Sequence, residues 1–139
     1  GLGCRSVSKI YFPKGYQIDT FFEAILDDFQ DVTQNNKYAN NYDYNKAVYL
    51  MGSNQLLDNG FLLLKEDAAL TSPVGVINYE FYDSIETLKA HLEEQQENLQ
   101  CVVSSKNTPL ETFNFGEAQC PALNDYADGV DTIQFLLEL

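Results

Sequence analysis

The chain has 139 residues, the size of one ordinary domain, and 45% of them are hydrophobic, so it can bury a core. Its 21 acidic and 8 basic residues give a net charge of -13, and this excess of acid argues against a nucleic-acid-binding surface. No apolar run approaches the roughly 20 residues of a transmembrane helix, and we expect a cytoplasmic protein without a membrane span.

The first residues and the cysteines narrow the class further. Residues 1–4 contain neither an initiator Met nor an apolar signal-peptide core, so we expect a piece of a longer protein. The three cysteines, Cys4, Cys101 and Cys120, lack the close spacing of a disulfide framework. His91 is the only histidine, so a zinc site would lack ligands and a Ser-His-Asp triad could form only with His91. We expect no bound metal.

The first half of the chain has strand signals followed by helix signals. Residues 7–12 are rich in β-branched and aromatic types and stop at Pro13, which predicts a strand. Thr20 and Glu23 have the spacing of a capping box and predict the start of a helix. Five apolar side chains of this helix are expected to face the core: Phe21, Phe22, Ile25, Leu26 and Phe29. The Asn-rich segment 34–44 predicts an exposed loop.

The second half continues the alternation. A second helix is expected from about Tyr42 to Leu57, with Gly60 as its left-handed stop. Three further strands are expected at 61–64, 74–79 and 99–103, and the strand at 74–79 has the composition of one buried on both faces. Two more helices are expected, one that begins at the capping box of Asp83 and Glu86 and a short one over 131–137.

This order of elements predicts the fold class. Strands that alternate with helices are typical of α/β proteins with a largely parallel sheet. We therefore expect a three-layer αβα architecture in a single domain that spans residues 1–139.

Cys4 is the sharpest candidate for chemistry. Small neighbours, among them Gly3 and Ser6, leave room for a substrate to approach its sulfur, and it precedes a predicted strand. Arg5 adds a positive charge that favours the thiolate. On composition alone, however, a lone cysteine near a terminus is more often inert.

The other candidates have simpler explanations. Cys101 lies within a predicted strand and is expected to be a core residue, whereas Cys120 is expected to be structural or incidental. His91 belongs to an acidic helix and is expected at the surface. Three acids of the tail are spaced as if to hold a cation, but the rest of a calcium loop is missing, and capping and turn roles are favoured: Asp125, Asp128 and Asp131.

Several stretches together resemble one enzyme superfamily. The segment 3–13, Gly-Cys-Arg-Ser-Val-Ser-Lys-Ile-Tyr-Phe-Pro, resembles the segment that begins at the catalytic cysteine of the aldehyde dehydrogenase superfamily. The segment 71–77 resembles the loop of that superfamily that ends in Gly-Pro-Val, together with the strand after it, and 83–88 resembles the next helix. The tail, at 115–119 and 124–132, is similar to the end of the bioluminescence-type long-chain fatty acyl-CoA reductases. The resemblance covers nearly the whole chain in one collinear order.

The resemblance implies the C-terminal catalytic-domain fragment of an acyl-CoA reductase with an aldehyde-dehydrogenase-like fold. Cys4 would attack a fatty acyl-CoA or another acyl thioester, and a hydride from NADPH would release a fatty aldehyde. The backbone N–H of Cys4 would supply half of an oxyanion hole. The domain that binds NADPH and the glutamate base would precede residue 1, so this fragment alone would be inactive. A second copy of the chain is a further expected partner.

Two alternatives stay open beside this interpretation. Ala69 stands where many members of the superfamily have a glutamate that holds the nicotinamide ribose. This difference favours a reductase over the first alternative, a fragment of an NAD-dependent aldehyde dehydrogenase. The second alternative is a non-catalytic acidic interaction domain, in which Cys4 would be buried. A catalytic fragment, by contrast, should expose an apolar patch near Cys4.

Overall fold

The computed structural model describes residues 3, 5–105, 108–110, 112–120, 122–123, 126 and 130–138. The chain divides into two compact units, Gly1–Ser84 and Ile85–Leu139. Whether these two units form the single domain expected over residues 1–139 stays a prediction.

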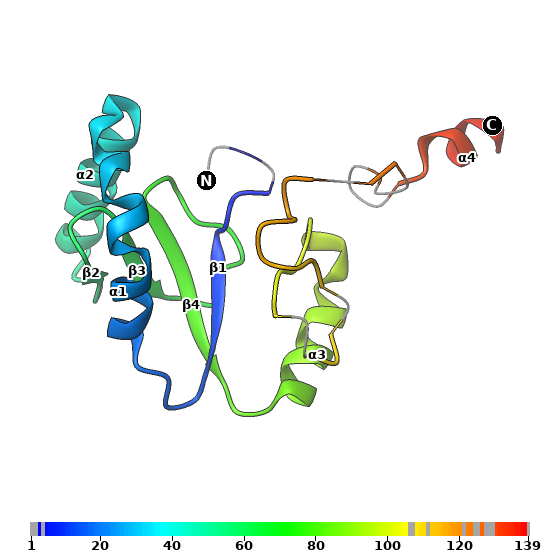
Figure 1. Ribbon diagram of the computed structural model, residues 1–139, viewed down its shortest axis with the longest axis horizontal. Coiled ribbons are helices and arrows are strands. Elements are labelled where there is room, and N and C mark those ends of the chain that lie inside the picture. Colours follow the sequence, from blue (N-terminus) through cyan, green and yellow to red (C-terminus); the bar gives the residue numbers. More distant parts are fainter. Residues whose placement is uncertain are drawn as a thin grey trace. The chain divides into compact units, whose positions relative to one another are not determined.

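A four-stranded sheet forms the centre of the first unit (Figure 1). Its strands lie in the order β1 (Lys9–Pro13), β4 (Val76–Tyr82), β3 (Leu63–Glu66) and β2 (Leu57–Asp58). Both β1 and β3 pair in parallel with β4, whereas β2 pairs antiparallel with β3. The first unit is therefore a mixed α/β structure with a mostly parallel sheet, as the alternation of elements predicts.

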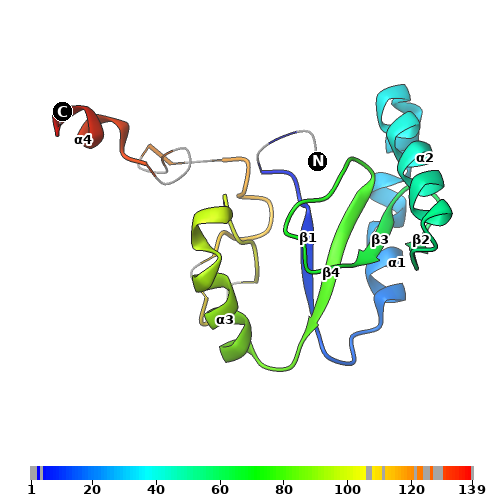
Figure 2. The same cartoon turned by 180° about the vertical axis from the view of Figure 1, so that it is seen from behind.

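The two faces of this sheet are covered by different helices (Figures 1 and 2). Successive side chains of a strand point to opposite faces, so each strand contributes to both contacts. On one face, Phe12, Leu64 and Tyr79 pack against α1 (Ile18–Phe29). On the other face, Leu63 and Val76 pack against α2 (Asn36–Met51). The short 3-10 helix η1 (Gln30–Gln34) joins the two helices. Leu63, Leu64 and Val76 are fully buried, so the core of this unit lies along β3 and β4.

The parallel strands β3 and β4 are joined by residues 67–75, which we call the crossover segment. A connection between parallel neighbours must carry the chain back along the sheet, and most proteins use a helix for it. Here the crossover segment contains no helix. It returns beside the start of β1, where Ser8 donates a hydrogen bond to the Leu70 carbonyl.

The second unit has less regular structure. It contains α3 (Ile85–Glu94), the 3-10 helix η2 (Gln96–Asn98) and α4 (Thr132–Leu137). Leu88 and Leu92 of α3 are buried, as the sequence predicts. The predicted strand at 99–103 is wrong: the described residues there form only an isolated bridge between Val103 and Phe113.

The predicted loop at 34–44 is also wrong, because α2 begins at Asn36. The side chain of Asn35 accepts hydrogen bonds from the N–H groups of Lys37 and Tyr38, so one of the asparagines taken as a loop signal is in fact the N-cap. Tyr38 and Tyr42 then follow at helical spacing and pack on the sheet. The polar residues between them are those of a surface helix.

Two helix ends and two core assignments also differ from the prediction. The first helix begins at Ile18 and its N-cap is Gln17, so the capping box at Thr20 is not used. Leu26 and Phe29, which were also expected to face the core, are 42% and 58% exposed and lie outside it. The second helix ends at Met51, and Gly60, although left-handed at φ 94°, lies in the turn between β2 and β3.

Candidate functional site

Cys4 lies outside the described residues, but its neighbours in the sequence are described. The Ser6 N–H donates to the Gly3 carbonyl at 3.0 Å, and the Gly3 N–H donates to Ser6 Oγ at 3.2 Å. We call this pair of bonds the Gly3–Ser6 contact. A little further along, the Ser8 carbonyl accepts a hydrogen bond from the Asn78 N–H at 3.0 Å. The Gly3–Ser6 contact is thus close in sequence to the point where pairing with β4 begins.

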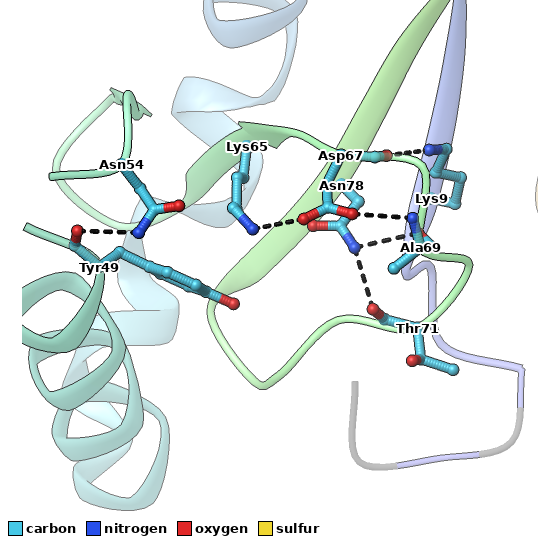
Figure 3. A network of polar contacts seen from close by, with 8 residues as sticks. All are labelled: Lys9, Tyr49, Asn54, Lys65, Asp67, Ala69, Thr71 and Asn78. Carbon is cyan, nitrogen blue, oxygen red and sulfur yellow. Dashed lines mark hydrogen bonds and ion pairs between the residues drawn. The ribbon is translucent and has the colours of Figure 1, made fainter. Parts of the chain in front are cut away.

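A closed set of hydrogen bonds joins the start of β1 to the crossover segment. Asn78 Nδ2 donates to the carbonyls of Ala69 and Thr71 at 3.0 and 2.9 Å (Figure 3). The carbonyl between them, that of Leu70, accepts from Ser8 Oγ at 2.8 Å. We call these bonds, with that between the Asn78 N–H and the Ser8 carbonyl, the Ser8–Asn78 ring. Asn78 is only 3% exposed, so water competes little for its bonds to the carbonyls.

Charged groups flank this ring on the same face of the sheet. The strand register places Lys9 and Lys65 on either side of Asn78. The ammonium of Lys9, whose side chain is 6% exposed, pairs with the Glu80 carboxylate at 2.7 Å and donates to the Asp67 carbonyl. Lys65 pairs with the Asp67 carboxylate (Figure 3). A buried ammonium needs such partners to offset the loss of its hydration.

The pKa directions in this cluster indicate fixed charges. The hydrogen bond from Lys65, with a second from the Ala69 N–H, lowers the pKa of the Asp67 carboxyl. Burial, with the nearby charge of Glu80, raises the pKa of the Tyr11 hydroxyl. Near neutral pH, Asp67 is therefore ionised and Tyr11 is protonated. The hydrogen bonds of the cluster support the backbone around Ser8 and Asn78.

A second polar cluster connects α2 to the turn before β3. Tyr42 donates to Asp58 Oδ1 at 2.6 Å, and Lys46 Nζ lies 2.6 Å from Asp58 Oδ2. The Gly60 N–H donates to the same carboxylate at 2.8 Å. Burial, then the hydrogen bond to Asp58, raises the pKa of Tyr42 to about 12. We call this arrangement the Tyr42–Asp58 clamp, and its role is to hold α2 on the sheet.

A cleft of about 290 Å³ opens where β3 extends past β2. Its lining residues are mostly amide and charged side chains: Asn54, Gln55, Leu56, Leu57, Lys65, Glu66 and Tyr79. The lining contains no thiol or imidazole, and its Lys65 ammonium is already paired with Asp67. This cleft therefore has the polar groups to bind a ligand but no evident nucleophile.

The remaining predicted residues belong to the second unit of the chain. His91 is exposed in the last turn of α3, as predicted, and Cys120 is exposed. Cys101 is only half-buried and outside any strand, so its assignment as a core strand residue is wrong. Asp131 caps α4 by accepting from two N–H groups, whereas Asp125 and Asp128 are not among the described residues. No metal-binding group of three or more His, Cys, Asp or Glu occurs in the described residues.

Sequence reasoning missed Ser8, Lys9 and Asn78 as a connected group. A signal was present, because Asn78 interrupts the apolar run at 74–79 and Lys9 interrupts the one at 7–12. A polar side chain in a strand that is buried on both faces needs a partner. The partners of Asn78 are backbone carbonyls of the crossover segment, which no residue-type pattern identifies.

Three helix N-termini among the described residues do not favour the phosphates of a dinucleotide. A phosphate binds a helix N-terminus through its free N–H groups. Asn35 at α2 and Asp131 at α4 already accept those N–H groups, and Asp19 brings a negative charge into the first turn of α1. The N-termini of these three helices therefore do not favour a phosphate of NADPH.

No protein-family model, curated protein or solved structure matches this chain. Within the described part of the chain, every helix is too short or too polar to cross a membrane.

Proposed function

We propose that this chain is the C-terminal catalytic part of a fatty acyl-CoA reductase of the aldehyde dehydrogenase superfamily, with Cys4 as its nucleophile. One observation carries the proposal: the order of elements from β1 to α3 agrees with the resemblance in the sequence, whereas the strand that the resemblance implies at 101–104 is not formed. The segment that contains Cys4 leads into β1, α1 follows, and the segment 71–73 precedes β4 and then α3. A mostly parallel sheet with helices on both faces is the setting that an aldehyde-dehydrogenase-like fold requires.

The proposed reaction uses the thiolate of Cys4 twice. The thiolate attacks the carbonyl carbon of the acyl thioester, a new carbon–sulfur bond forms, and coenzyme A leaves as its thiolate. NADPH, the second substrate, would supply a hydride to the acyl carbon when bound. Collapse of the resulting adduct releases the fatty aldehyde and restores the Cys4 thiolate. A thiol suits both steps, because it is nucleophilic near neutral pH and its thioester is electrophilic enough to accept hydride.

The neighbours of Cys4 in the sequence supply the expected support for this chemistry. Arg5, which is half-buried, adds a positive charge that favours a thiolate. The Cys4 N–H is the proposed donor to the oxyanion that forms during attack. In comparable sites, one such donor contributes about 3 kcal/mol to the transition state.

The proposal is tested by acyl transfer to the full-length protein that contains this chain. Incubation with a radiolabelled long-chain acyl-CoA, without NADPH, should give one acyl group per protein, which hydroxylamine removes. Cys4→Ala should abolish the label, whereas Cys101→Ala and Cys120→Ala, the matched controls, should retain it. Label that survives Cys4→Ala would reject Cys4 as the nucleophile.

Two further measurements separate the alternatives. A fragment of an NAD-dependent aldehyde dehydrogenase predicts faster turnover with aldehyde and NAD than with acyl-CoA and NADPH. A non-catalytic acidic interaction domain predicts that iodoacetamide modifies Cys4 more slowly than the half-buried Cys101. The cytoplasmic location and the self-association expected from the sequence belong to the same proposal.

A further inference from the structure

We propose that the cleft beside β3 is a binding site for an uncharged ligand that carries secondary amides along an extended chain. The main-chain N–H and C=O of Glu66 pair with one amide of this ligand, as one strand of a sheet pairs with the next. This binding site is additional to the proposed acyl transfer, and neither activity depends on the other.

The main-chain groups of alternate residues on β3 point to opposite sides of the strand. The Leu63 N–H donates to the Gly75 carbonyl at 2.9 Å, and the Asp67 N–H donates to a carbonyl of β4 at 3.2 Å. The groups of Leu64 and Glu66 therefore face the other way, towards β2. The pairing with β2 includes Leu64 but ends before Glu66. Among the described residues, no strand pairs with Glu66 on this side of β3.

The chain before β2 does not continue the pairing, because it is held against the end of α2. The Asn54 N–H donates to the Tyr49 carbonyl at 3.0 Å, and Asn54 Nδ2 donates to the same carbonyl at 3.2 Å (Figure 3). Ser53, the residue before, has a φ of 57°, which is uncommon for a residue with a Cβ. The cleft therefore opens where residues 54–56 leave the side of β3.

The lining of the cleft offers the groups that an amide ligand needs. Asn54 and Gln55 contribute side-chain amides, which can both donate and accept hydrogen bonds, and Tyr79 contributes a hydroxyl. Leu56 and Leu57 give apolar contacts for the carbon atoms between the amides. The volume of about 290 Å³ is close to that of the smallest ligand sites, so the cleft suits a short stretch of chain.

The charges around the cleft favour an uncharged ligand. The Lys65 ammonium pairs with the Asp67 carboxylate and also lies 5.0 Å from the centre of the Tyr49 ring. A phosphate or carboxylate in the cleft would therefore meet the carboxylate of Glu66 beside a lysine whose charge is already paired. The net charge of -13 adds to this repulsion.

Two kinds of ligand carry secondary amides along an extended chain: the pantetheine arm of a coenzyme A thioester and the backbone of a peptide. Both present the N–H and C=O groups that an unpaired strand edge binds. Two unreactive compounds serve as probes. S-methyl pantetheine represents the first source, and the blocked dipeptide N-acetyl-dialanine methylamide represents the second.

Glu66→Pro tests the site directly, because it removes the N–H that faces the cleft and leaves the pairing of β3 with β4 intact. Glu66→Gln is the matched control, since it keeps the N–H and removes only the charge. If Glu66→Pro does not fold, Gln55→Trp fills the cleft from an exposed position. Its control is Asn40→Trp, at an exposed position of α2 outside the lining.

Saturation-transfer NMR on the full-length protein gives the dissociation constant of each probe, and amide hydrogen exchange reports on the Glu66 N–H. We expect at least one probe to bind in the millimolar range and to slow exchange at Glu66. Glu66→Pro should weaken this binding by about fivefold or more, whereas Glu66→Gln should remain within about twofold of the wild type. The probe that binds more tightly identifies the source of the amide.

Three results would overturn the proposal: neither probe binds, a probe binds without protecting the Glu66 N–H, or Glu66→Pro and Glu66→Gln bind equally well. If Glu66→Pro does not fold, equal binding by Gln55→Trp and Asn40→Trp has the same meaning. Acylation of Cys4 is a separate measurement, so a failure here does not reject the proposed function.

Discussion

The ammonium of Lys9 lies 2.7 Å from the carboxylate of Glu80, on neighbouring parallel strands and on the same face of the sheet. The Lys9 side chain is almost fully buried, whereas that of Glu80 is 36% exposed. Glu80→Gln should lower the free energy of unfolding by about 1–3 kcal/mol, less than for a fully buried pair, because Glu80 is partly screened by solvent. Urea denaturation of Glu80→Gln, Lys9→Met and the double variant measures the coupling. Additive losses in the double variant would contradict the ion pair.

Asn78 is predicted to be the most sensitive polar position of the sheet. Asn78→Ala removes two hydrogen bonds, those to the carbonyls of Ala69 and Thr71, from a side chain that is 3% exposed, and each lost bond costs about 0.5–1.5 kcal/mol. Asn54→Ala, which removes one half-buried amide bond to Tyr49, is the control and should cost about 1 kcal/mol. Denaturant unfolding compares the two. Equal losses would mean that the crossover segment does not depend on Asn78.

Gly75 is required both for its positive φ and for its close contact with α2, whereas Gly60 shares only the positive φ. Both have positive φ, 82° at Gly75 and 94° at Gly60, which costs a residue with a Cβ about 1–2 kcal/mol. At Gly75 an added Cβ would also lie 3.0 Å from the Cα and Cβ of Tyr42, whereas at Gly60 nothing lies within 4 Å. Gly75→Ala should therefore destabilise the protein by at least about 1 kcal/mol more than Gly60→Ala in thermal unfolding. The reverse order would show that α2 yields easily at Tyr42.

The Tyr42–Asp58 clamp predicts a loss of stability at alkaline pH. The pKa of Tyr42 is raised from 10.0 to about 12 in the folded protein, so its contribution is fully present below pH 10 and is lost as the pH rises towards 12. Tyr42→Phe should flatten this part of the stability curve. Denaturation midpoints at several pH values from 9 to about 12 test this. An unchanged slope in Tyr42→Phe would assign the alkaline loss to other tyrosines.

The Tyr42–Asp58 clamp also predicts a loss of stability at acidic pH, because the pKa of Asp58 is lowered, whereas that of Tyr42 is raised. Burial acts to raise the pKa of Asp58, but hydrogen bonds from Lys46, Tyr42 and the Gly60 N–H outweigh it, and the net pKa is below 3.8. A lowered pKa stabilises the fold above the unfolded-state value, and this contribution disappears as the pH falls below 3.8. Asp58→Asn should be less stable at neutral pH and should lose less on acidification. Circular dichroism during acid titration gives both quantities.

The sequence predicts three of the four strands of the first unit and the helix ends less well. The strand β2 is missed, because Leu57 was expected to end the second helix. The runs at 7–12, 61–64 and 74–79 correspond to β1, β3 and β4, each of which begins two residues later, at Lys9, Leu63 and Val76. Composition marks an apolar run, but pairing with a neighbour decides where the strand starts. The role of Asn35 as the N-cap of α2 was not predicted, because asparagine favours both loops and N-caps.

The candidate site depends on contacts that local patterns cannot contain. Cys4 is a candidate through its neighbours and through the resemblance, and its chemistry stays a proposal. The bond between Ser8 and Leu70 spans most of the first unit in sequence, and Asn78 binds backbone atoms, which carry no residue-type signal. Only the fold brings these groups together.

The parallel pairing of β1 with β4 also sets the order in which the first unit can be completed during synthesis. β1 leaves the ribosome before the other strands, yet the strand beside it, β4, ends only at Tyr82. Until then Ile10 and Phe12 lack their neighbours on β4, and the nascent chain carries an unpaired apolar edge. A pause in translation before Tyr82 would prolong the interval in which chaperones can bind that edge.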